Sequence, residues 1–150
     1  WHGQEVAMAT EPLDFETLLK NRDPHKKWER LPKDTILGHI HLHVSDLKAT
    51  EEFYVKGLGF EVVNRFGPQA IFLSTGQYHH HIGANTWNGV GAPTPPENSV
   101  GMESFRLVLP DEAVMQQTIN NLRNIGATVS NEAGRILTHD PSGNRIELTV

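Results

Sequence analysis

Hydrophobic and polar residues alternate along the segment LGHIHLHV, residues 37–44. A period of two is the pattern of a β-strand, in which successive side chains point to opposite faces. The aliphatic members are Ile40, Leu42 and Val44, and the imidazoles between them are His39, His41 and His43. The pattern predicts one strand face that packs under helices and a second face, lined by imidazoles, that faces a concavity.

The residues that follow predict a helix and three further strands. In the helix, 45–59, Ser45 or Asp46 is the expected cap and Gly57 or Gly59 the expected end. The strand-forming segments that come next, separated by turn residues, are 60–66, 70–75 and 78–87. Together with the first strand they predict a β-α-β-β-β unit over residues 37–88.

The same order of elements recurs after the Pro- and Gly-rich link 88–101. Asp111 is placed to cap a second helix, and Gly126 to end it. The strands predicted around this helix are 103–109, 127–130, 135–140 and 144–150. We therefore predict an α+β fold in which two β-α-β-β-β units, 37–88 and 102–150, form a curved mixed sheet that encloses a cavity.

Residues 1–36 read as an N-terminal arm or linker before this domain, which spans 37–150. The segment EPLDFETLLKNR predicts a short helix with a small apolar patch, and the next residues are broken by prolines. We expect the arm to pack on the domain or on a neighbour and to carry no chemistry. The chain begins at Trp1 without an initiator methionine, and we expect it to be part of a longer polypeptide.

Composition narrows the candidate chemistry. The 150 residues contain no cysteine, which excludes disulfides and thiolate metal sites, so a metal would need nitrogen and oxygen ligands. The formal net charge of −5 argues against a nucleic-acid partner. No apolar run approaches the ~18 residues that cross a bilayer, and a cytoplasmic setting is expected.

Nine histidines gather mainly in two segments, the first strand and the run YHHHIGANTW, 78–87. Neutral imidazole is the commonest metal ligand in proteins, whereas polar residues facing water are the alternative explanation. Alternation along 78–87 puts His80 on the same face as Ile82. A carboxylate, Glu147, interrupts the last aliphatic strand and must be paired, protonated or metal-bound. Its expected partners, if it is paired, are Arg135 and Arg145.

Two histidines and one carboxylate from separate strands form a ligand set that suits Fe(II) or Mn(II) and leaves positions open for substrate. Zn or Ni can occupy the same donors. The sequence motifs LGHIHLHVSDLKATEEFYVKGLGFEVV and HDPSGNRIELTV resemble the vicinal oxygen chelate superfamily, which includes glyoxalase I, extradiol dioxygenases and bleomycin-resistance proteins. YHHHIGANTWNGVGAP and the arm resemble, more narrowly, the C-terminal half of bacterial catechol-2,3-dioxygenase-like proteins.

This resemblance implies a set of site residues. His39 falls on the first metal ligand of the family and Glu147 on the last. Ser104, with Glu103 adjacent, falls on the second ligand of extradiol enzymes, where serine is a poor ligand. His80 falls on the acid/base histidine and is also placed to serve as the third ligand, whereas Leu137 replaces the family's tyrosine.

The resemblance implies a metal-dependent, ring-cleaving extradiol dioxygenase-like protein with a small, catecholic substrate. A glyoxalase-type isomerase or lyase needs the same donors and stays open. So does a non-catalytic C-terminal half of a two-domain enzyme, which the losses at Ser104 and Leu137 favour. A homodimer or pairing with an N-terminal domain is the expected assembly.

Overall fold

The computed structural model describes residues 1–3, 5–9, 11–96 and 98–150. The undescribed positions fall in the arm and in the link that the sequence predicts. The first unit forms a four-stranded sheet. Its strands, in spatial order, are β1 (Ile40–His43), β4 (Ile82–Asn85), β3 (Ala70–Ser74) and β2 (Glu61–Phe66). β1 runs parallel to β4, and the other neighbours are antiparallel.

The second unit repeats this topology. Its sheet has the order β5 (Phe105–Val108), β8 (Arg145–Thr149), β7 (Arg135–His139) and β6 (Val129–Glu132), with β5 parallel to β8. The predicted pair of β-α-β-β-β units is confirmed. The strands of the described residues form two separate four-stranded sheets, so the curved surface is divided between the units and no barrel closes.

Each unit carries its helix where the sequence predicts it. α2 (Leu47–Glu52) continues into the π-helical turn η1 (Phe53–Gly57), and the Asp46 side chain accepts a hydrogen bond from the Ala49 N–H at its start. α3 (Glu112–Asn124) begins in the same way, with the Asp111 carboxylate accepting from the Val114 N–H at 2.8 Å. Gly126 ends α3 with a φ of +79°, a conformation that glycine adopts without strain.

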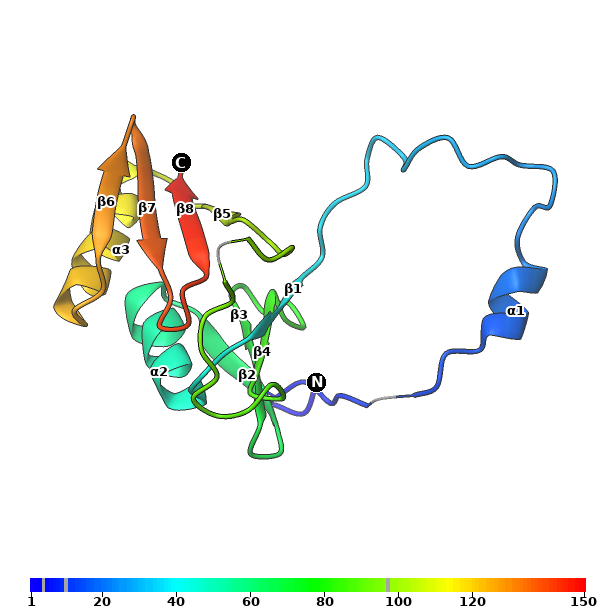
Figure 1. The fold of residues 1–150 in the computed structure, drawn as a ribbon, viewed down its shortest axis with the longest axis horizontal. Helices are drawn as coiled ribbons and strands as arrows, with labels where there is room; N and C mark the ends of the chain where they lie inside the picture. Colours follow the sequence, from blue (N-terminus) through cyan, green and yellow to red (C-terminus); the bar gives the residue numbers. More distant parts are fainter. Residues whose placement is uncertain (4, 10, 97) are drawn as a thin grey trace.

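One apolar core serves both units. Tyr54 of η1, Leu73 of β3, Leu122 of α3 and Ile146 of β8 all have no exposed surface and belong to one cluster. α2 packs against the first sheet and α3 against the second, and α3 also contacts η1, the continuation of α2 (Figure 1). The face of each sheet that carries the alternating aliphatic residues therefore packs onto the helices, and the opposite face is left for chemistry.

Polar contacts also join the units. The buried Tyr54 hydroxyl donates to Asp140 Oδ2 at 3.1 Å. Asp140 Oδ1 accepts from the backbone N–H groups of Ser142 and Asn144, which forms an Asx turn. The Ser45 N–H donates to the Ser142 hydroxyl at 2.9 Å. The turn before β8 is thereby fixed against the first unit.

The arm divides into a docked and a projecting part. The Val6 N–H donates to the Val63 carbonyl of β2, and Val6 and Met8 pack on Val63, Ala70 and Phe72. Beyond them the short helix α1 (Phe15–Lys20) lies away from the two sheets (Figure 1), with its apolar side chains exposed. The expectation of packing on the domain thus holds for its first residues alone.

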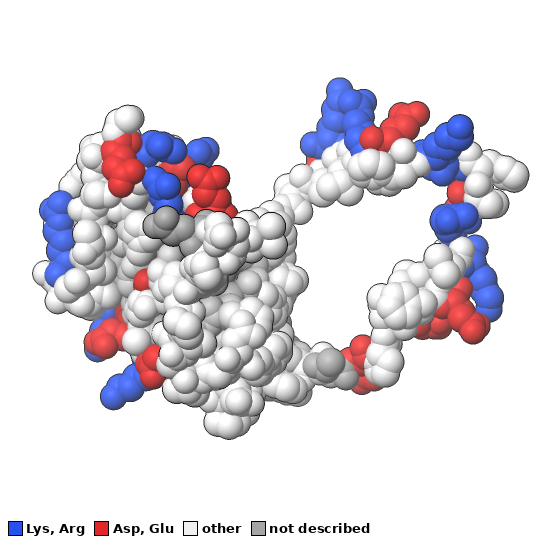
Figure 2. Space-filling model, in the orientation of Figure 1, with Lys and Arg blue, Asp and Glu red and all other residues white. Residues whose placement is uncertain are grey.

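Lys and Arg side chains gather along this projecting part, as Figure 2 shows. None of the helices in the described part of the chain has both the length and the apolar character that a membrane span requires.

Candidate metal centre

The first strand presents its imidazoles as the alternation predicts. Leu42 and Val44 are 3% exposed and belong to the shared core, whereas His41 and His43 lie on the other face. His39 directly precedes β1 and shares the face of His41, with ring centroids 5.4 Å apart. The aliphatic stripe fixes the strand in the core and so fixes the imidazoles on the concave face.

His80 reaches the same face by a different route from the one predicted. β4 begins at Ile82 rather than at residue 78, and residues 78–81 form an irregular turn whose His81 N–H donates to the Leu73 carbonyl. Because this turn interrupts the alternation, His80 lies beside His39 while Ile82 enters the core. The prediction that His80 and Ile82 share one face is therefore wrong.

These elements bring three imidazoles together. One ring nitrogen from each of His39, His41 and His80 lies within 4.8 Å of the other two. Among the described residues this is the one group of three or more His, Asp or Glu donors at such spacing. The His39 and His80 ring centroids are 4.4 Å apart, and those of His41 and His80 are 5.9 Å apart. We call this group the three-histidine cluster.

His80 is the buried member of the cluster. It is 7% exposed, and its Nδ1 lies 2.9 Å from Nδ1 of His79. Its Nε2 is buried and has no hydrogen-bond partner among the described residues. Burial, followed by the neighbouring imidazoles, lowers the pKa of His80 to about 4. Burial and the charges of His39 and His43 also lower the pKa of His41. Both rings are therefore neutral at pH 7, which is the form that binds metal.

Glycine at position 83 makes room for His41. The two residues are paired across the parallel strands β1 and β4. A Cβ at Gly83 would lie 2.7 Å from Cε1 and 2.8 Å from Nε2 of the His41 ring. The absence of a side chain here lets the imidazole lie flat over β4, toward His80.

An apolar wall backs the cluster. The Phe72 ring of β3 contacts His80 edge-to-face at a centroid distance of 5.0 Å and His41 at 5.9 Å. Phe72 also packs with Val6 and Met8 of the docked arm. This wall shields His80 from water, whereas His39 and His41 are exposed on the open side of the cluster.

Glu147 lies outside the three-histidine cluster. It is the middle residue of β8, between Arg106 of β5 and the buried Leu137 of β7. Arg106 Nη2 donates to both carboxylate oxygens at 3.2 Å. The expectation that Arg135 or Arg145 would pair with Glu147 is wrong, because β5 is the parallel neighbour of β8 and Arg106 is directly in register. Arg145 pairs with Glu132 instead.

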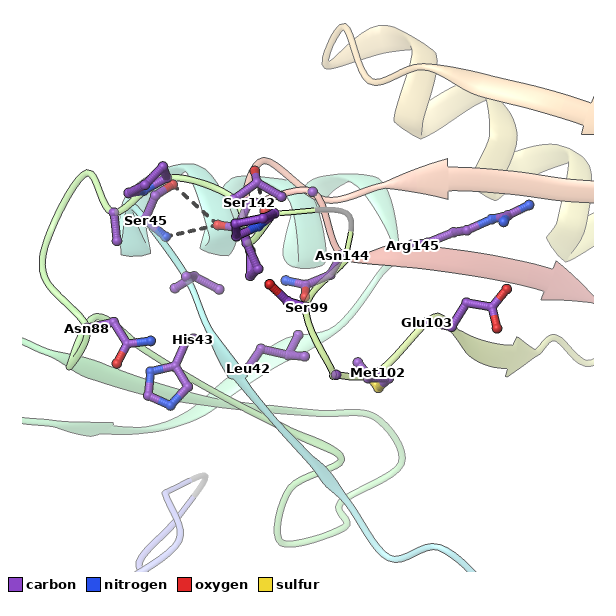
Figure 3. A pocket seen from close by; sticks show the side chains of 18 of the residues that line it. Leu42, His43, Ser45, Asn88, Ser99, Met102, Glu103, Ser142, Asn144 and Arg145 are labelled. Carbon is purple, nitrogen blue, oxygen red and sulfur yellow. Dashed lines mark hydrogen bonds between the residues drawn. The ribbon is translucent and has the colours of Figure 1, made fainter.

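A cavity of about 560 Å³ lies between the two units. β1 contributes His41 and His43, the link contributes Asn88 and residues 92–96, and the second unit contributes Glu103 and Arg145. Figure 3 shows His43 and Asn88 on one side, Glu103 and Arg145 on the other, and the Ser45–Ser142 contact above His43. Ser104 precedes β5 next to Glu103 and belongs to neither the cavity lining nor the three-histidine cluster.

His41 belongs to the three-histidine cluster but is absent from the ligands that we predict from the sequence. It belongs to both the cluster and the cavity lining, so it connects the candidate ligands to a space of substrate size. Its position two residues after His39 on the same strand face already indicated this proximity. The burial of His80 and the space over Gly83 could be found only in three dimensions.

Comparisons with known proteins agree with this architecture. The chain is 41% identical over 145 residues to a catechol-2,3-dioxygenase of Bacillus subtilis (strain 168), a match that covers 95% of this chain and 50% of that protein. The chain thus spans about half the length of that curated relative.

Solved structures share the fold. A possible glyoxalase from Bacillus cereus superposes with a TM-score of 0.58 at 17% identity, covering 76% of this chain and 97% of that one. A lactoylglutathione lyase from Agrobacterium tumefaciens gives 0.54 at 22% identity, covering 78% and 94%. At these identities the likeness concerns the fold alone.

The family model of the Glyoxalase/Bleomycin resistance protein/Dioxygenase superfamily matches residues 36–148. The match spans both β-α-β-β-β units and the cavity between them. The resemblance seen in the sequence is thereby confirmed, and the chain belongs to the Glyoxalase/Bleomycin resistance protein/Dioxygenase superfamily.

Proposed function

We propose that this chain is the metal-binding part of an extradiol-type dioxygenase that acts on a catecholic substrate. One observation carries the proposal: the buried Nε2 of His80 has no hydrogen-bond partner in the described part of the chain, and its ring lies against His39 and His41. A buried polar atom without a partner is costly unless something outside the protein satisfies it. The 41% identity to a named catechol-2,3-dioxygenase supports the reaction class.

The residues present fit a divalent metal. Neutral imidazole nitrogens suit Fe(II), Mn(II), Zn and Ni, and three of them leave coordination positions open. Fe(II) or Mn(II) is the choice that matches a dioxygenase. When bound, such an ion would lower the pKa of the substrate hydroxyls and orient them.

Glu147 is the further ligand that the family resemblance implies. Its carboxylate is held by Arg106, so a role in metal binding requires this ion pair to open. In the proposed set His41 joins His39 and His80 as a ligand. Ser104, at the position of the family's second ligand, offers only a hydroxyl, which is a poor ligand. Leu137, at the position of the family's tyrosine, offers no hydrogen bond to a substrate.

The remaining groups act on the substrate. The cavity of about 560 Å³ beside His41 has room for one aromatic ring, and the link closes one side of it. His80 serves as a ligand rather than as the acid/base group, because its pKa of about 4 makes it a weak base near neutral pH. His43 lines the cavity outside the three-histidine cluster and is placed to accept the proton of a substrate hydroxyl.

The test loads the purified chain anaerobically with Fe(II), then follows metal content and oxygen uptake with catechol. His41→Ala is expected to lose bound metal and turnover together. His43→Ala is expected to keep the metal and lose most turnover. His25→Ala, on the exposed arm, is the matched control and should change neither.

Two results would contradict the proposal. If wild-type protein binds no Fe(II), Mn(II) or Zn, the proposed metal site is contradicted. Wild-type protein that binds one metal ion per chain but takes up no oxygen with catechol would show that this chain alone has no dioxygenase activity.

Pairing is part of the proposal, because the projecting arm leaves Phe15, Leu18 and Leu19 exposed. An exposed apolar cluster on a short helix is typical of a surface that another chain or domain covers. The proposed partner is a second pair of β-α-β-β-β units. It would come either from a second copy of this chain or from a longer polypeptide, since the relative is about twice as long as this chain. Sedimentation of the chain with and without Leu18→Glu tests the first of these.

A further inference from the structure

We propose that His79 is a positioning residue for the metal centre: it accepts a hydrogen bond from Nδ1–H of His80 and thereby keeps the Nε2 lone pair of His80 free to bind. The family resemblance gives His79 no role. The consequence for metal binding rests on the proposed function, whereas the position of the proton can be measured without metal.

The contact between the two rings admits two arrangements. The two Nδ1 atoms are 2.9 Å apart, so one of them carries a proton and the other accepts it. If His80 donates, its Nε2 is a bare lone pair. If His79 donates, neutral His80 must carry its own proton on Nε2, where it cannot bind a metal.

Burial favours the first arrangement. Nε2 of His80 is buried and has no partner among residues 1–3, 5–9, 11–96 and 98–150, so a proton there would be an orphaned donor. Orphaned buried N–H groups are rarer than under-satisfied acceptors, and leaving one unpaired costs about 1–3 kcal/mol. A lone pair at the same atom can instead be satisfied by an ion held with His39 and His41.

His79 is suited to accept. Its side chain is exposed, so its own proton can stay on Nε2 in contact with water while Nδ1 presents a lone pair. The Tyr78 ring packs against it at a centroid distance of 4.1 Å and an interplanar angle of 38°. This packing holds the His79 ring in the orientation that the contact requires.

The arrangement matches what metal-binding histidines need in general. The second nitrogen of such a ring is usually hydrogen-bonded, which fixes the tautomer and the ring orientation, and loss of this partner typically costs 10- to 100-fold in metal affinity. For His80 that partner is His79, its immediate neighbour in sequence.

The test combines nitrogen NMR of the His80 ring in metal-free protein with Co(II) affinity and the visible Co(II) spectrum. Wild type is expected to carry the His80 proton on Nδ1. His79→Phe keeps a ring but removes the acceptor, and it should mix the tautomers, weaken Co(II) about 10- to 100-fold and alter the spectrum. His79→Asn restores an acceptor oxygen and should recover the wild-type affinity to within about threefold.

Tyr78→Phe is the matched control, since it keeps the stacked ring and should change neither readout. The inference is overturned if wild-type His80 carries its proton on Nε2, or if His79→Phe leaves the tautomer unchanged. If wild-type protein carries the His80 proton on Nδ1 but does not bind Co(II), the proposed metal site is contradicted and the His79–His80 hydrogen bond is still supported.

Discussion

The two units place different chemistry on equivalent strands. In the first sheet β1 lies parallel to β4 with His41 opposite Gly83, and in the second β5 lies parallel to β8 with Arg106 opposite Glu147. Counting outward from these pairs, His39 corresponds to Ser104 and His80 to Asn144. The positions of the three imidazoles thus hold Ser104, Arg106 and Asn144 in the second unit, where Arg106 forms an ion pair with Glu147.

The difference lies in whether each group finds its partner within the protein. Arg106 and Glu147 satisfy each other, and Asn144 donates from its side chain to Asp140 Oδ2 at 2.8 Å. In the three-histidine cluster the buried Nε2 of His80 is left without a partner. Of two duplicated surfaces, the one with unmet hydrogen-bonding capacity is the better candidate for a ligand site.

The largest expected effect comes from the position where the units differ most plainly. His39→Ala should weaken Zn or Co(II) binding about a thousandfold, because a direct ligand contributes more than the 10- to 100-fold of an outer partner. Ser104→Ala, the same position of the second unit, should leave affinity unchanged. Calorimetric titration measures both, and equal losses in the two variants would contradict the assignment of the site to the first unit.

Histidine protonation below pH 7 should occur mainly in the first unit, since His139 is the one histidine after residue 101. Because the two units share one core, the resulting loss of stability concerns both. In metal-free protein the pKa of His80 is lowered from 6.5 to about 4, so the unfolded chain binds the proton more tightly. Stability present above pH 6.5 is therefore lost as the pH falls toward 4, by about 3 kcal/mol in total.

Thermal unfolding at several pH values between 7 and 4 measures this loss. His80→Gln should flatten the dependence across that window. An unchanged slope in this variant would show that His80 is not the group responsible.

A smaller effect is expected where Gly83 makes room for His41. Gly83→Ala would place its Cβ 2.7 Å from the imidazole, so the ring must move and metal affinity should fall about tenfold. Gly101→Ala is the control, because a Cβ there meets nothing within 4 Å and the residue has no positive φ. Metal titration of Gly83→Ala at wild-type affinity would mean that the His41 ring is not a ligand.

The smallest effect should come from the ion pair of the second unit. Glu147→Gln is expected to change metal affinity less than about twofold and stability by no more than about 1 kcal/mol, as is usual for a pair with an exposed partner. The same titration and a thermal melt measure both. A loss of metal comparable to that of His39→Ala would restore the carboxylate as a ligand and show that Arg106 releases it.

Alternation and turn residues predicted most of the fold. Ile40, Leu42 and Val44 enter the core as their spacing requires, and Asp111 caps its helix. These features depend on residues close in sequence. The face of His80 could not be predicted in this way, because the irregular turn before Ile82 interrupts the period of two.

The candidate site was predictable only in part, for a similar reason. His39 and His80 meet as the resemblance implies, but the partner of Glu147 depends on the parallel register of β5 and β8, whose residues lie 41 positions apart. Periodicity within one strand says nothing about its register against a distant strand. The place of His41 in the cluster depends on a missing side chain at position 83, which no pattern of polarity marks.

The apolar cluster shared by both sheets has a consequence for any attempt to separate the two repeats. Leu122 and Ile146 of one repeat pack with Tyr54 and Leu73 of the other. A fragment that carried one repeat alone would expose these side chains to water, and we expect it to aggregate or to associate with a second copy.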